Sequence, residues 1–425
     1  MIKIASEVYM ANSSNDSSSF TRTDLLVLKN YDDKILKPIG PIAIISDQLD
    51  SVLSDSINFH LRNRRSITIN EHPEQKSIPG YYRTDYRIPV SLERFHSGEG
   101  KSIISESVRG HDLFIITDVL NYGHRYERFE QDVSVSPDEH FEDLCRIISA
   151  VHGVAKRINV IMPYLYEGRV SRRISRGSLD CSVMLKRLFD LGIDNFLTFD
   201  AHDERMANAV PTKNFESTKT SLQLIEALLN EYDDLKIDPD HFMVASADET
   251  SIKRCIYYAS LMKVPLGLFY RRYDPRLIDK GQYTEQSIKQ HAEKKFLGDN
   301  IAGKDILIID DMIDTGKTIL ECAHQLKRQK ARRVFAAVSF AQFSKGINSF
   351  DSAYKDGTLT KIFATNLAYR PPELLEREWF CDVNLAKYIA LLIDGYNHDA
   401  PLSSLINPSK RIHELLNNYK GVSNV

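Results

Sequence analysis

The chain has 425 residues, of which 42% are hydrophobic and 27% are charged, and its mean hydropathy is −0.32. This length predicts two or three domains with full-sized cores, and the composition excludes a fibrous or disordered protein. A net charge of −3 and a pI near 6.5 provide no global positive field, so we expect neither a nucleic acid nor a membrane as a partner.

The cysteines and the first residues indicate the compartment. The five cysteines lie far apart and include no C-x-x-C pair, so neither a zinc cluster nor a disulfide framework is predicted. The first twenty residues lack the apolar core of a signal peptide, and no apolar run is long enough to span a membrane. We therefore expect a cytoplasmic protein.

The predicted elements begin after residues 1–40, which contain the Ser/Asn-rich stretch Asn12 to Ser19 and are interpreted as an N-terminal extension with little core of its own. From Gly40 onward, apolar runs alternate with segments of helical periodicity. Helical spacing is clearest from Phe141 to Ala155 and from Leu185 to Phe189. The apolar runs predict strands at 42–45, 113–116, 160–162, 196–199, 242–245, 266–269, 306–309, 334–339 and 362–364.

This alternation predicts an α/β fold with mostly parallel sheets flanked by helices. The polar, charged run at 231–241 separates two sets of strand and helix units. We therefore expect an N-terminal α/β domain at 41–220 and a C-terminal α/β domain at 221–425.

One stretch of the C-terminal domain, KDILIIDDMIDTGKTILECAHQLKR at 304–328, combines acids with a glycine turn. Ile306 to Ile309 is typical of a buried parallel strand, and a helical stripe begins soon after Gly316. Ligands bind at the carboxyl ends of the strands in open α/β sheets. The amides at the start of the helix can hold a phosphate, and Asp310 and Asp311 can accept hydrogen bonds from a vicinal diol. The pattern therefore predicts a site for a ribose phosphate.

Two other interpretations explain less of this stretch. Gly316-Lys317-Thr318 matches the end of the nucleotide P-loop, G-x-x-x-x-G-K-[ST], but that pattern requires a glycine where the chain has Asp311. A plain strand followed by an Asp or Thr helix cap explains one acid and not three.

Four further stretches lie at the ends of predicted strands. A cationic loop in the second of them suits a polyphosphate, because guanidinium groups stay charged and bind phosphate oxygens in pairs; a solvated basic loop is the alternative. Its members are Arg169, Arg172, Arg173 and Arg176. The four stretches are RFHSGEGKSIISESVRGHDLFII at 94–116, MPYLYEGRVSRRISRG at 162–177, FLTFDAHDERMANAVP at 196–211 and MVASADETSIKRC at 243–255.

These stretches occur in the order found in the ribose-phosphate pyrophosphokinases, the phosphoribosyl pyrophosphate synthetases, and the chain resembles a divergent member of that family. The tail agrees, with FSKGINSFDS, TKIFATNL and DVNLAKYIALLIDGYNHDAPLSSLI following. The resemblance covers roughly residues 41 to 406. It implies two type I phosphoribosyltransferase-like domains, each with a mostly parallel sheet flanked by helices.

The resemblance implies how ATP and magnesium are held. Arg169 and Arg172 would contact ATP. His202 and Asp248 match a metal-binding histidine and aspartate of the family, and His202 would also take part in ATP binding and catalysis. Carboxylate and phosphate oxygens suit Mg²⁺, whereas histidine is a less usual ligand, so a water molecule could intervene.

The resemblance also implies a shared site. Phe95 and Glu99 match the family's F-x-D-G-E motif, which reads the adenine from a neighbouring subunit, so we expect a homo-oligomer, either a dimer or a hexamer. A turn at Gly98 with a core phenylalanine is the alternative. Arg271 and Arg272 lie where the family has the basic, catalytic residues of a loop that closes over the transferring phosphates.

The acceptor would lie on the stretch at 304–328, and several residues depart from the family pattern. The acceptor-binding residues implied are Asp310, Asp311, Asp314, Thr315, Gly316, Lys317 and Thr318. The departures are Arg169-Val170-Ser171 for R-Q-D, Thr250-Ser251 for a double glycine, Ser97 for the motif aspartate, Arg271 for a lysine, Tyr273 for an arginine and Lys317 for a small residue.

The implied reaction is Mg²⁺-dependent transfer of the β,γ-diphosphate of ATP to the anomeric hydroxyl of ribose 5-phosphate, which gives phosphoribosyl pyrophosphate and AMP. Lys317 leaves a second acceptor open: ADP-ribose, whose second phosphate the lysine would meet, giving ADP-ribose pyrophosphate for NAD salvage. A catalytically silent regulatory member is a further alternative. The last alternative is a type I phosphoribosyltransferase, and the stretches at 94–116 and 162–177 count against it.

Overall fold

The computed structural model describes residues 36–46, 52–171, 173, 176–273 and 292–419. The chain forms two compact units. The first unit takes its described residues from 1–219, 367–369 and 384–407, and the second takes them from 220–366, 370–383 and 408–425. The chain therefore returns to the first unit near its end. The predicted domain boundary at 220 stays a prediction.

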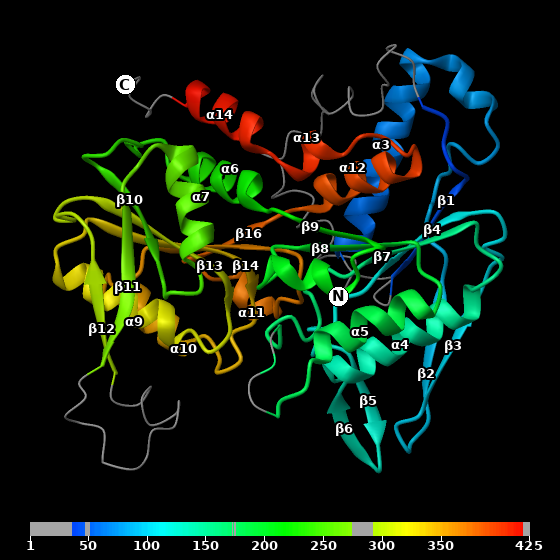
Figure 1. The fold of residues 1–425 in the computed structure, drawn as a ribbon, viewed down its shortest axis with the longest axis horizontal. Helices are drawn as coiled ribbons and strands as arrows, with labels where there is room; N and C mark the ends of the chain where they lie inside the picture. The colour runs from blue at the N-terminus through cyan, green and yellow to red at the C-terminus, as the bar shows by residue number, and fades with distance from the viewer. Residues whose placement is uncertain (1–35, 47–51, 172, 174–175, 274–291, 420–425) are drawn as a thin grey trace. The chain divides into compact units, whose positions relative to one another are not determined.

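The first unit is built on a five-stranded sheet in the order β1-β4-β7-β8-β9 (Figure 1). All four strand pairs are parallel. Every residue of β1, β4 and β8 is buried, which explains why these strands appear in the sequence as unbroken apolar runs. The strands are β1 (Ile42–Ser46), β4 (Asp112–Ile116), β7 (Arg157–Ile161), β8 (Asn195–Phe199) and β9 (Asn214–Thr218).

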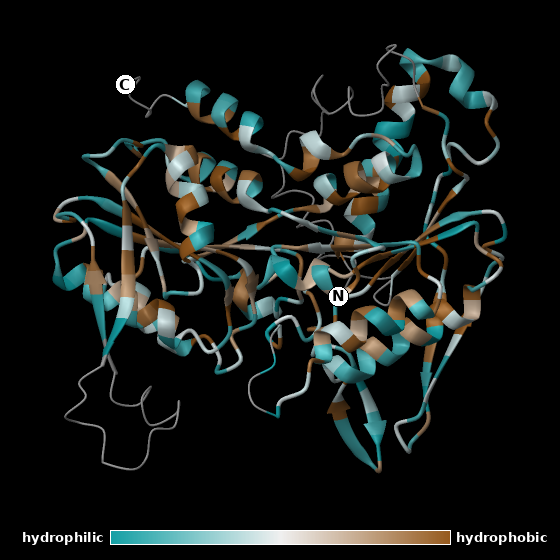
Figure 2. Cartoon of the chain, viewed as in Figure 1, coloured by the Kyte–Doolittle hydropathy of each residue, from teal (hydrophilic) through white to brown (hydrophobic). Residues whose placement is uncertain are grey.

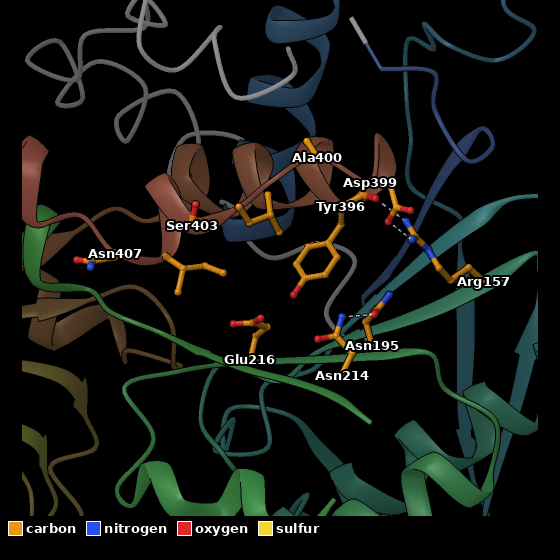
Figure 3. Close-up of a pocket in the computed structure, with 11 residues that line it drawn as sticks. Arg157, Asn195, Asn214, Glu216, Tyr396, Asp399, Ala400, Ser403 and Asn407 are labelled. Atoms are coloured by element: carbon orange, nitrogen blue, oxygen red, sulfur yellow. Dashed lines mark hydrogen bonds and ion pairs between the residues drawn. The ribbon is translucent and has the colours of Figure 1, made fainter. Parts of the chain in front are cut away.

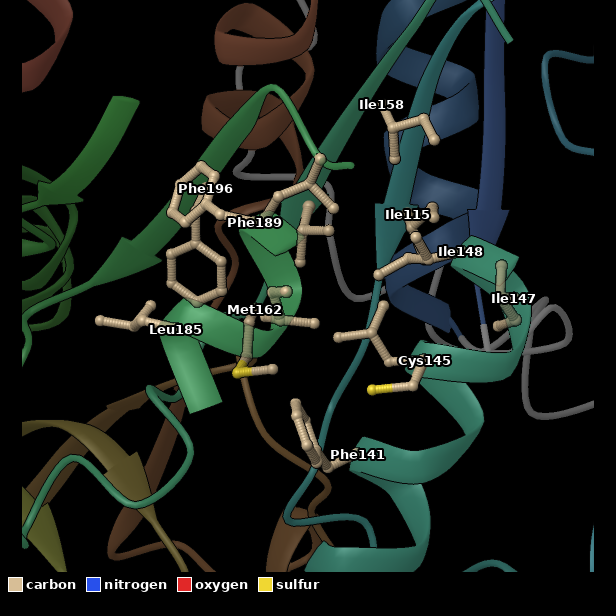
Figure 4. Close-up of a cluster of buried hydrophobic side chains, with 14 of the residues drawn as sticks. Ile115, Phe141, Cys145, Ile147, Ile148, Ile158, Met162, Leu185, Phe189 and Phe196 are labelled. Carbon is tan, nitrogen blue, oxygen red and sulfur yellow. The ribbon is translucent and has the colours of Figure 1, made fainter. Parts of the chain in front are cut away.

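Helices α4 (Pro137–Val151) and α5 (Asp180–Asp190) contribute the core of this unit. Ser136 and Glu139 form a reciprocal capping box that begins α4, and Figure 2 shows apolar and polar bands along both helices. Figure 4 shows Phe141, Leu185 and other apolar side chains of these helices among those of the strands.

Helix α3 (Val52–Glu71) was not predicted, because it carries buried charges instead of an apolar stripe. Arg64 and Arg65 are both buried, and each contacts the carboxylate of Asp394 on helix α12 (Ala386–Asn397). Burial alone would raise the pKa of Asp394, but Arg65 and Arg64 lower it to about 2. The ion cluster therefore holds helix α12, which lies near the end of the sequence, against helix α3 of the first unit.

Two antiparallel hairpins complete the first unit, and neither was predicted. One pairs β2 (Val90–Arg94) with β3 (Gly100–Ile104), and the other pairs β5 (Arg125–Arg128) with β6 (Gln131–Ser134). The remaining short elements are η1 (Pro73–Ser77), η2 (Glu204–Ala209) and α13 (Ser403–Ile406).

The second unit is built on a seven-stranded sheet in the order β12-β11-β10-β13-β14-β15-β16. Only the β11–β12 pair is antiparallel. The strands are β10 (Phe242–Ser246), β11 (Leu266–Tyr273), β12 (Ala292–Leu297), β13 (Asp305–Ile313), β14 (Arg333–Ala341), β15 (Lys361–Thr365) and β16 (Phe380–Val383). The helices are α6 (Ser221–Glu231), α7 (Ile252–Met262), α9 (Lys317–Arg328), α10 (Asn348–Lys355), α11 (Pro372–Leu375) and α14 (Ser409–Asn418).

The predicted α/β fold with mostly parallel sheets flanked by helices is confirmed, and all nine predicted strands exist. The predicted lengths were wrong where strands continue through polar residues, as in β11 and β13. Among the described residues, no helix is both long enough and apolar enough to cross a membrane.

Candidate active site

Asp310 and Asp311 lie within strand β13 and not after it, so the predicted end of this strand at Ile309 was wrong, whereas Asp314 follows the strand. Pairing with β14 continues past Asp310, with Met312 opposite Phe340. Asp311 is buried, and its backbone N–H donates to the carboxylate of Asp310 at 3.0 Å. The two carboxyl groups nevertheless lie close together at the carboxyl end of the sheet, since, besides burial, the charge of Asp311 and a side-chain hydrogen bond with it both raise the pKa of Asp310.

A third acid, Asp248, follows the adjacent strand β10. Its carboxylate accepts hydrogen bonds from the N–H of Thr250 at 2.9 Å and from the N–H of Ser251 at 3.2 Å, so it closes the turn into helix α7. Burial, together with the charges of Asp311 and Asp248, raises the pKa of Asp310 well above its usual range. The three acids therefore form an acid-rich surface where two neighbouring strands end.

This surface suits a hard cation, because carboxylate oxygens are the ligands that Mg²⁺ prefers. Among the described parts of the chain, no group of three His, Cys, Asp or Glu side chains is arranged to hold a metal ion by itself. Magnesium bound here would therefore take other ligands from phosphate oxygens and water, as is usual for this ion.

The acceptor loop, residues 310–318, is fastened to the end of β14. The N–H of Ser344 donates to the carbonyl of Asp314 at 2.9 Å, and the Ser344 hydroxyl donates to the Asp314 carboxylate. The N–H of Gln342 donates to the carbonyl of Ile313 at 2.8 Å. Asp314 is therefore engaged in holding the loop.

Both the backbone conformation and the neighbouring side chains require a glycine at position 316. Its φ is +79°, in the left-handed region, and a Cβ added there would lie 2.2 Å from Cζ of Phe350. Phe350 is fully buried between Phe343 and Trp379, with ring centroids 4.9 and 5.6 Å away. Gly316 therefore lets the loop turn directly over an aromatic cluster.

Helix α9 begins at the next residue, and its N-cap residue, Gly316, has no side chain that could cap the first turn. The positive end of the helix dipole and the backbone N–H groups there form a surface for an anion. Thr315 is exposed, and its hydroxyl accepts only a long hydrogen bond, 3.4 Å, from the N–H of Lys317.

Lys317 points away from the loop. Its side chain is 81% exposed, and its ammonium lies 3.7 Å from the carboxylate of Glu321, one turn along α9. This position places the cation on the outer surface of the helix.

Arg271 and Arg272 lie at the carboxyl end of strand β11, which extends beyond its predicted end at Phe269. The N–H of Arg271 donates to the carboxylate of Glu249 at 2.8 Å, which joins this strand end to the turn that follows β10. Both arginines therefore belong to the same edge of the sheet as the acids.

In the first unit, His202 follows strand β8 and is exposed. Asp203 beside it was not predicted as a site residue, and its Oδ2 forms an ion pair with Nη2 of Arg205 at 2.7 Å. Hydrogen bonds from Arg205, and a further one from Ser171, lower the pKa of Asp203. Ser171 belongs to the loop after β7, so the loops that follow β7 and β8 meet here. Arg169 of the first loop is exposed, and Arg172 lies outside the described residues.

Phe95 and Glu99 form the turn between β2 and β3. The N–H of Phe95 donates to the carbonyl of Glu99 at 2.9 Å, and the hydroxyl of Ser97 donates to the Glu99 carboxylate at 2.9 Å. Phe95 is 55% exposed, so the alternative of a core phenylalanine is wrong. Gly98, with a φ of +96°, completes the turn.

The β5–β6 hairpin, which no sequence signal indicated, supports this turn. The N–H of Phe129 at its tip donates to the carbonyl of His96 at 3.1 Å. Phe129 and Glu130 both have positive φ, 48° and 63°, in a turn without glycine or asparagine. Sequence reasoning misses such a hairpin because the usual turn residues are absent.

Comparison with known proteins places these features in a family. Residues 67–192 match the family model of the N-terminal domain of ribose phosphate pyrophosphokinase, and residues 211–369 match that of the phosphoribosyl transferase domain. The ribose-phosphate pyrophosphokinase of Pasteurella multocida is 30% identical over 321 residues, which cover 74% of this chain and 90% of the relative.

Two further comparisons agree. The ribose-phosphate pyrophosphokinase of Vibrio parahaemolyticus is 27% identical over 323 residues, which cover 75% of this chain and 91% of the relative. The crystal structure of phosphoribosylpyrophosphate synthetase from Mycobacterium smegmatis has a TM-score of 0.64 at 17% identity and covers 85% of this chain and all of its own, which shows the shared fold. The chain therefore belongs to the ribose-phosphate pyrophosphokinase family, a family of transferases.

Proposed function

We propose that the chain transfers the β,γ-diphosphate of ATP to the anomeric hydroxyl of ribose 5-phosphate, giving phosphoribosyl pyrophosphate and AMP. The acceptor loop is the observation that carries this proposal. It combines Asp310 and Asp311 at a strand end with the left-handed Gly316 and the uncapped start of α9. A vicinal diol and a phosphate are complementary to such a surface. Membership of the family supports the same reaction.

In this reaction the anomeric oxygen forms a bond to the β-phosphorus, the bond from that phosphorus to the α,β-bridging oxygen breaks, and AMP leaves. The carboxylates of Asp310 and Asp311 would orient the ribose through its hydroxyls, and the first amides of α9 would hold the 5-phosphate. Positioning of the two reactants supplies much of the acceleration in such transfers.

Positive charge must balance the diphosphate as it moves. We assign Asp248 and His202 to Mg²⁺, which when bound would neutralise charge on the phosphate oxygens. The acid-rich surface that raises the pKa of Asp310 supports a cation beside Asp248. Arg169 in the first unit, and Arg271 and Arg272 in the second, would bind the polyphosphate directly.

The acceptor is ribose 5-phosphate in our proposal and not ADP-ribose, because Lys317 pairs with Glu321 on the outer face of α9. Turnover with Mg-ATP should be higher on ribose 5-phosphate than on ADP-ribose, and Lys317→Gly should leave that preference unaltered. A preference for ADP-ribose that Lys317→Gly abolishes would instead support the larger acceptor and a role in NAD salvage.

We infer an oligomer with a shared site from the exposure of Phe95 and from the family's use of this turn. A Phe95→Ala chain and an Arg169→Ala chain should each be weakly active alone, and mixing them should restore part of the activity, because some mixed sites carry neither change. A fully active monomer in sedimentation would contradict the inference.

A further inference from the structure

A pocket of about 490 Å³ lies in the first unit, at the edge strand β9 of the five-stranded sheet (Figure 3). Its floor includes Arg157, Asn195 and Asn214, which are the first residues of β7, β8 and β9. The residues following α12 and those of α13 close its other side. His202 follows the opposite, carboxyl end of β8, so the pocket is separate from the candidate active site.

A ladder of asparagine side chains runs across the sheet and ends in this pocket. Asp112 can only accept hydrogen bonds, and it accepts from Nδ2 of Asn159 at 2.8 Å. The Oδ1 of Asn159 then accepts from Nδ2 of Asn195, and the Oδ1 of Asn195 accepts from Nδ2 of Asn214, both at 2.5 Å. Because Asp112 fixes the direction of every amide, the last oxygen, Oδ1 of Asn214, is left as an acceptor.

Arg157, the one cation among the described residues that line the pocket, is already neutralised. Its Nε and Nη2 donate to Asp112 at 2.8 and 2.7 Å, and its Nη1 lies 3.4 Å from Asp399. Nη2 also donates to the carbonyl of Tyr396 at 2.6 Å. Arg157 therefore provides no positive charge for an anion, which makes this pocket unsuitable for a phosphate.

Two polar groups that line the pocket have no partner among the described residues. The hydroxyl of Tyr396 is buried and makes no hydrogen bond, and Glu216 makes neither a hydrogen bond nor an ion pair there. Figure 3 shows both groups pointing into the same space. Burial raises the pKa of Glu216, since nothing in the described chain stabilises its charged form, and a bound cation would reverse that effect.

We propose that this pocket binds a small organic cation, a primary ammonium or guanidinium compound, whose N–H groups donate to Glu216, to Oδ1 of Asn214 and to the hydroxyl oxygen of Tyr396. All three oxygens belong to side chains that line the pocket, and the ligand's charge would balance the carboxylate of Glu216. A cation of this kind supplies several donors and no acceptor, which matches the Glu216 carboxylate and Oδ1 of Asn214, since both can only accept hydrogen bonds. The proposal does not depend on the reaction at the candidate active site.

Isothermal titration calorimetry of the full chain with agmatine, which carries both a guanidinium and an ammonium group, tests the proposal. Agmatine should bind, and Glu216→Gln should raise its Kd about tenfold or more, because a charge-assisted hydrogen bond is lost. Tyr396→Phe, which removes one oxygen and keeps the ring, should raise the Kd several-fold. Glu376→Gln, the same charge change at an exposed acid of the second unit, should leave the Kd unchanged.

Three results would overturn the proposal. One is the absence of binding at agmatine concentrations up to roughly 10 mM. Another is an equal affinity in Glu216→Gln and in the unchanged chain. The third is displacement of agmatine by inorganic phosphate at similar concentrations, which would show that the pocket prefers an anion. Circular dichroism of each variant separates lost binding from lost folding.

Discussion

Replacing Gly316 with alanine should destabilise the second unit, for two separable reasons. An alanine at a φ of +79° costs about 1–2 kcal/mol, and the same cost applies at Gly303, whose φ is +80°. At Gly316 the new Cβ would also lie 2.2 and 2.3 Å from Cζ and Cε2 of Phe350, whereas nothing lies within 4 Å of the same atom at Gly303. Overpacking of this kind costs about 1–3 kcal/mol more. Gly316→Ala should therefore cost about 2–5 kcal/mol, and Gly303→Ala only the first part.

The single tryptophan of the chain reports on this region directly, because Trp379 stacks on Phe350 with 5.6 Å between ring centroids. Urea titrations followed by Trp379 fluorescence should give the loss for each variant. The double variant Gly316→Ala/Phe350→Leu should recover about 1–3 kcal/mol relative to the sum of the two single changes, because leucine removes the two ring atoms that clash.

If Gly316→Ala costs no more than Gly303→Ala, or if the double variant shows no coupling, the contact with Phe350 does not explain the loss. Because the same glycine is the N-cap residue of α9, Gly316→Ala should also raise the KM for ribose 5-phosphate more than the KM for ATP. An equal rise in both KM values would show that the loop does not bind the acceptor specifically.

Three further predictions concern the acids and the histidine. Burial and the charges of Asp311 and Asp248 raise the pKa of Asp310, so the contribution of Asp310 to stability is present at acid pH and is lost as the pH rises through the raised pKa. Asp310→Asn should therefore increase the Tm near pH 8 by at least about 2 °C but not near pH 4, while turnover falls; a Tm that drops at both pH values would show that the pKa is not raised. Asp311→Asn should weaken acceptor binding and leave ATP binding intact, as separate titrations of each substrate can measure; equal loss of both would remove Asp311 from the acceptor site. His202→Ala should increase the magnesium concentration needed for half-maximal turnover, and an unchanged metal titration would make His202 structural.

The acceptor loop could be predicted from the sequence because its signals are local. An apolar run, the acids and a glycine before a helical stripe lie within the single stretch at 304–328. The extension of β13 through Asp310 to Ile313 could not be predicted from the sequence. Aspartate is rare in strands, and pairing with β14 overrides its low strand propensity.

Other features depend on contacts between distant residues. Helix α3 is stabilised by the contacts of Arg64 and Arg65 with Asp394. Because its buried face carries charged side chains, the hydrophobic periodicity of the sequence does not predict this helix. The pocket in the first unit depends on strand register, since Asn195 lies opposite both Asn159 and Asn214 in the sheet. Nothing in the spacing of these asparagines along the chain indicates that they join.

Analysis of the nucleotide product distinguishes diphosphoryl transfer to a ribose phosphate from the other reactions of ATP. The chain incubated with Mg-ATP and ribose 5-phosphate should form AMP and phosphoribosyl pyrophosphate in equal amounts, with no AMP when the acceptor is omitted. Formation of ADP would show transfer of a single phosphoryl group, and the absence of AMP with either ribose 5-phosphate or ADP-ribose would leave a catalytically silent member of the family. Either result would contradict diphosphoryl transfer by this chain.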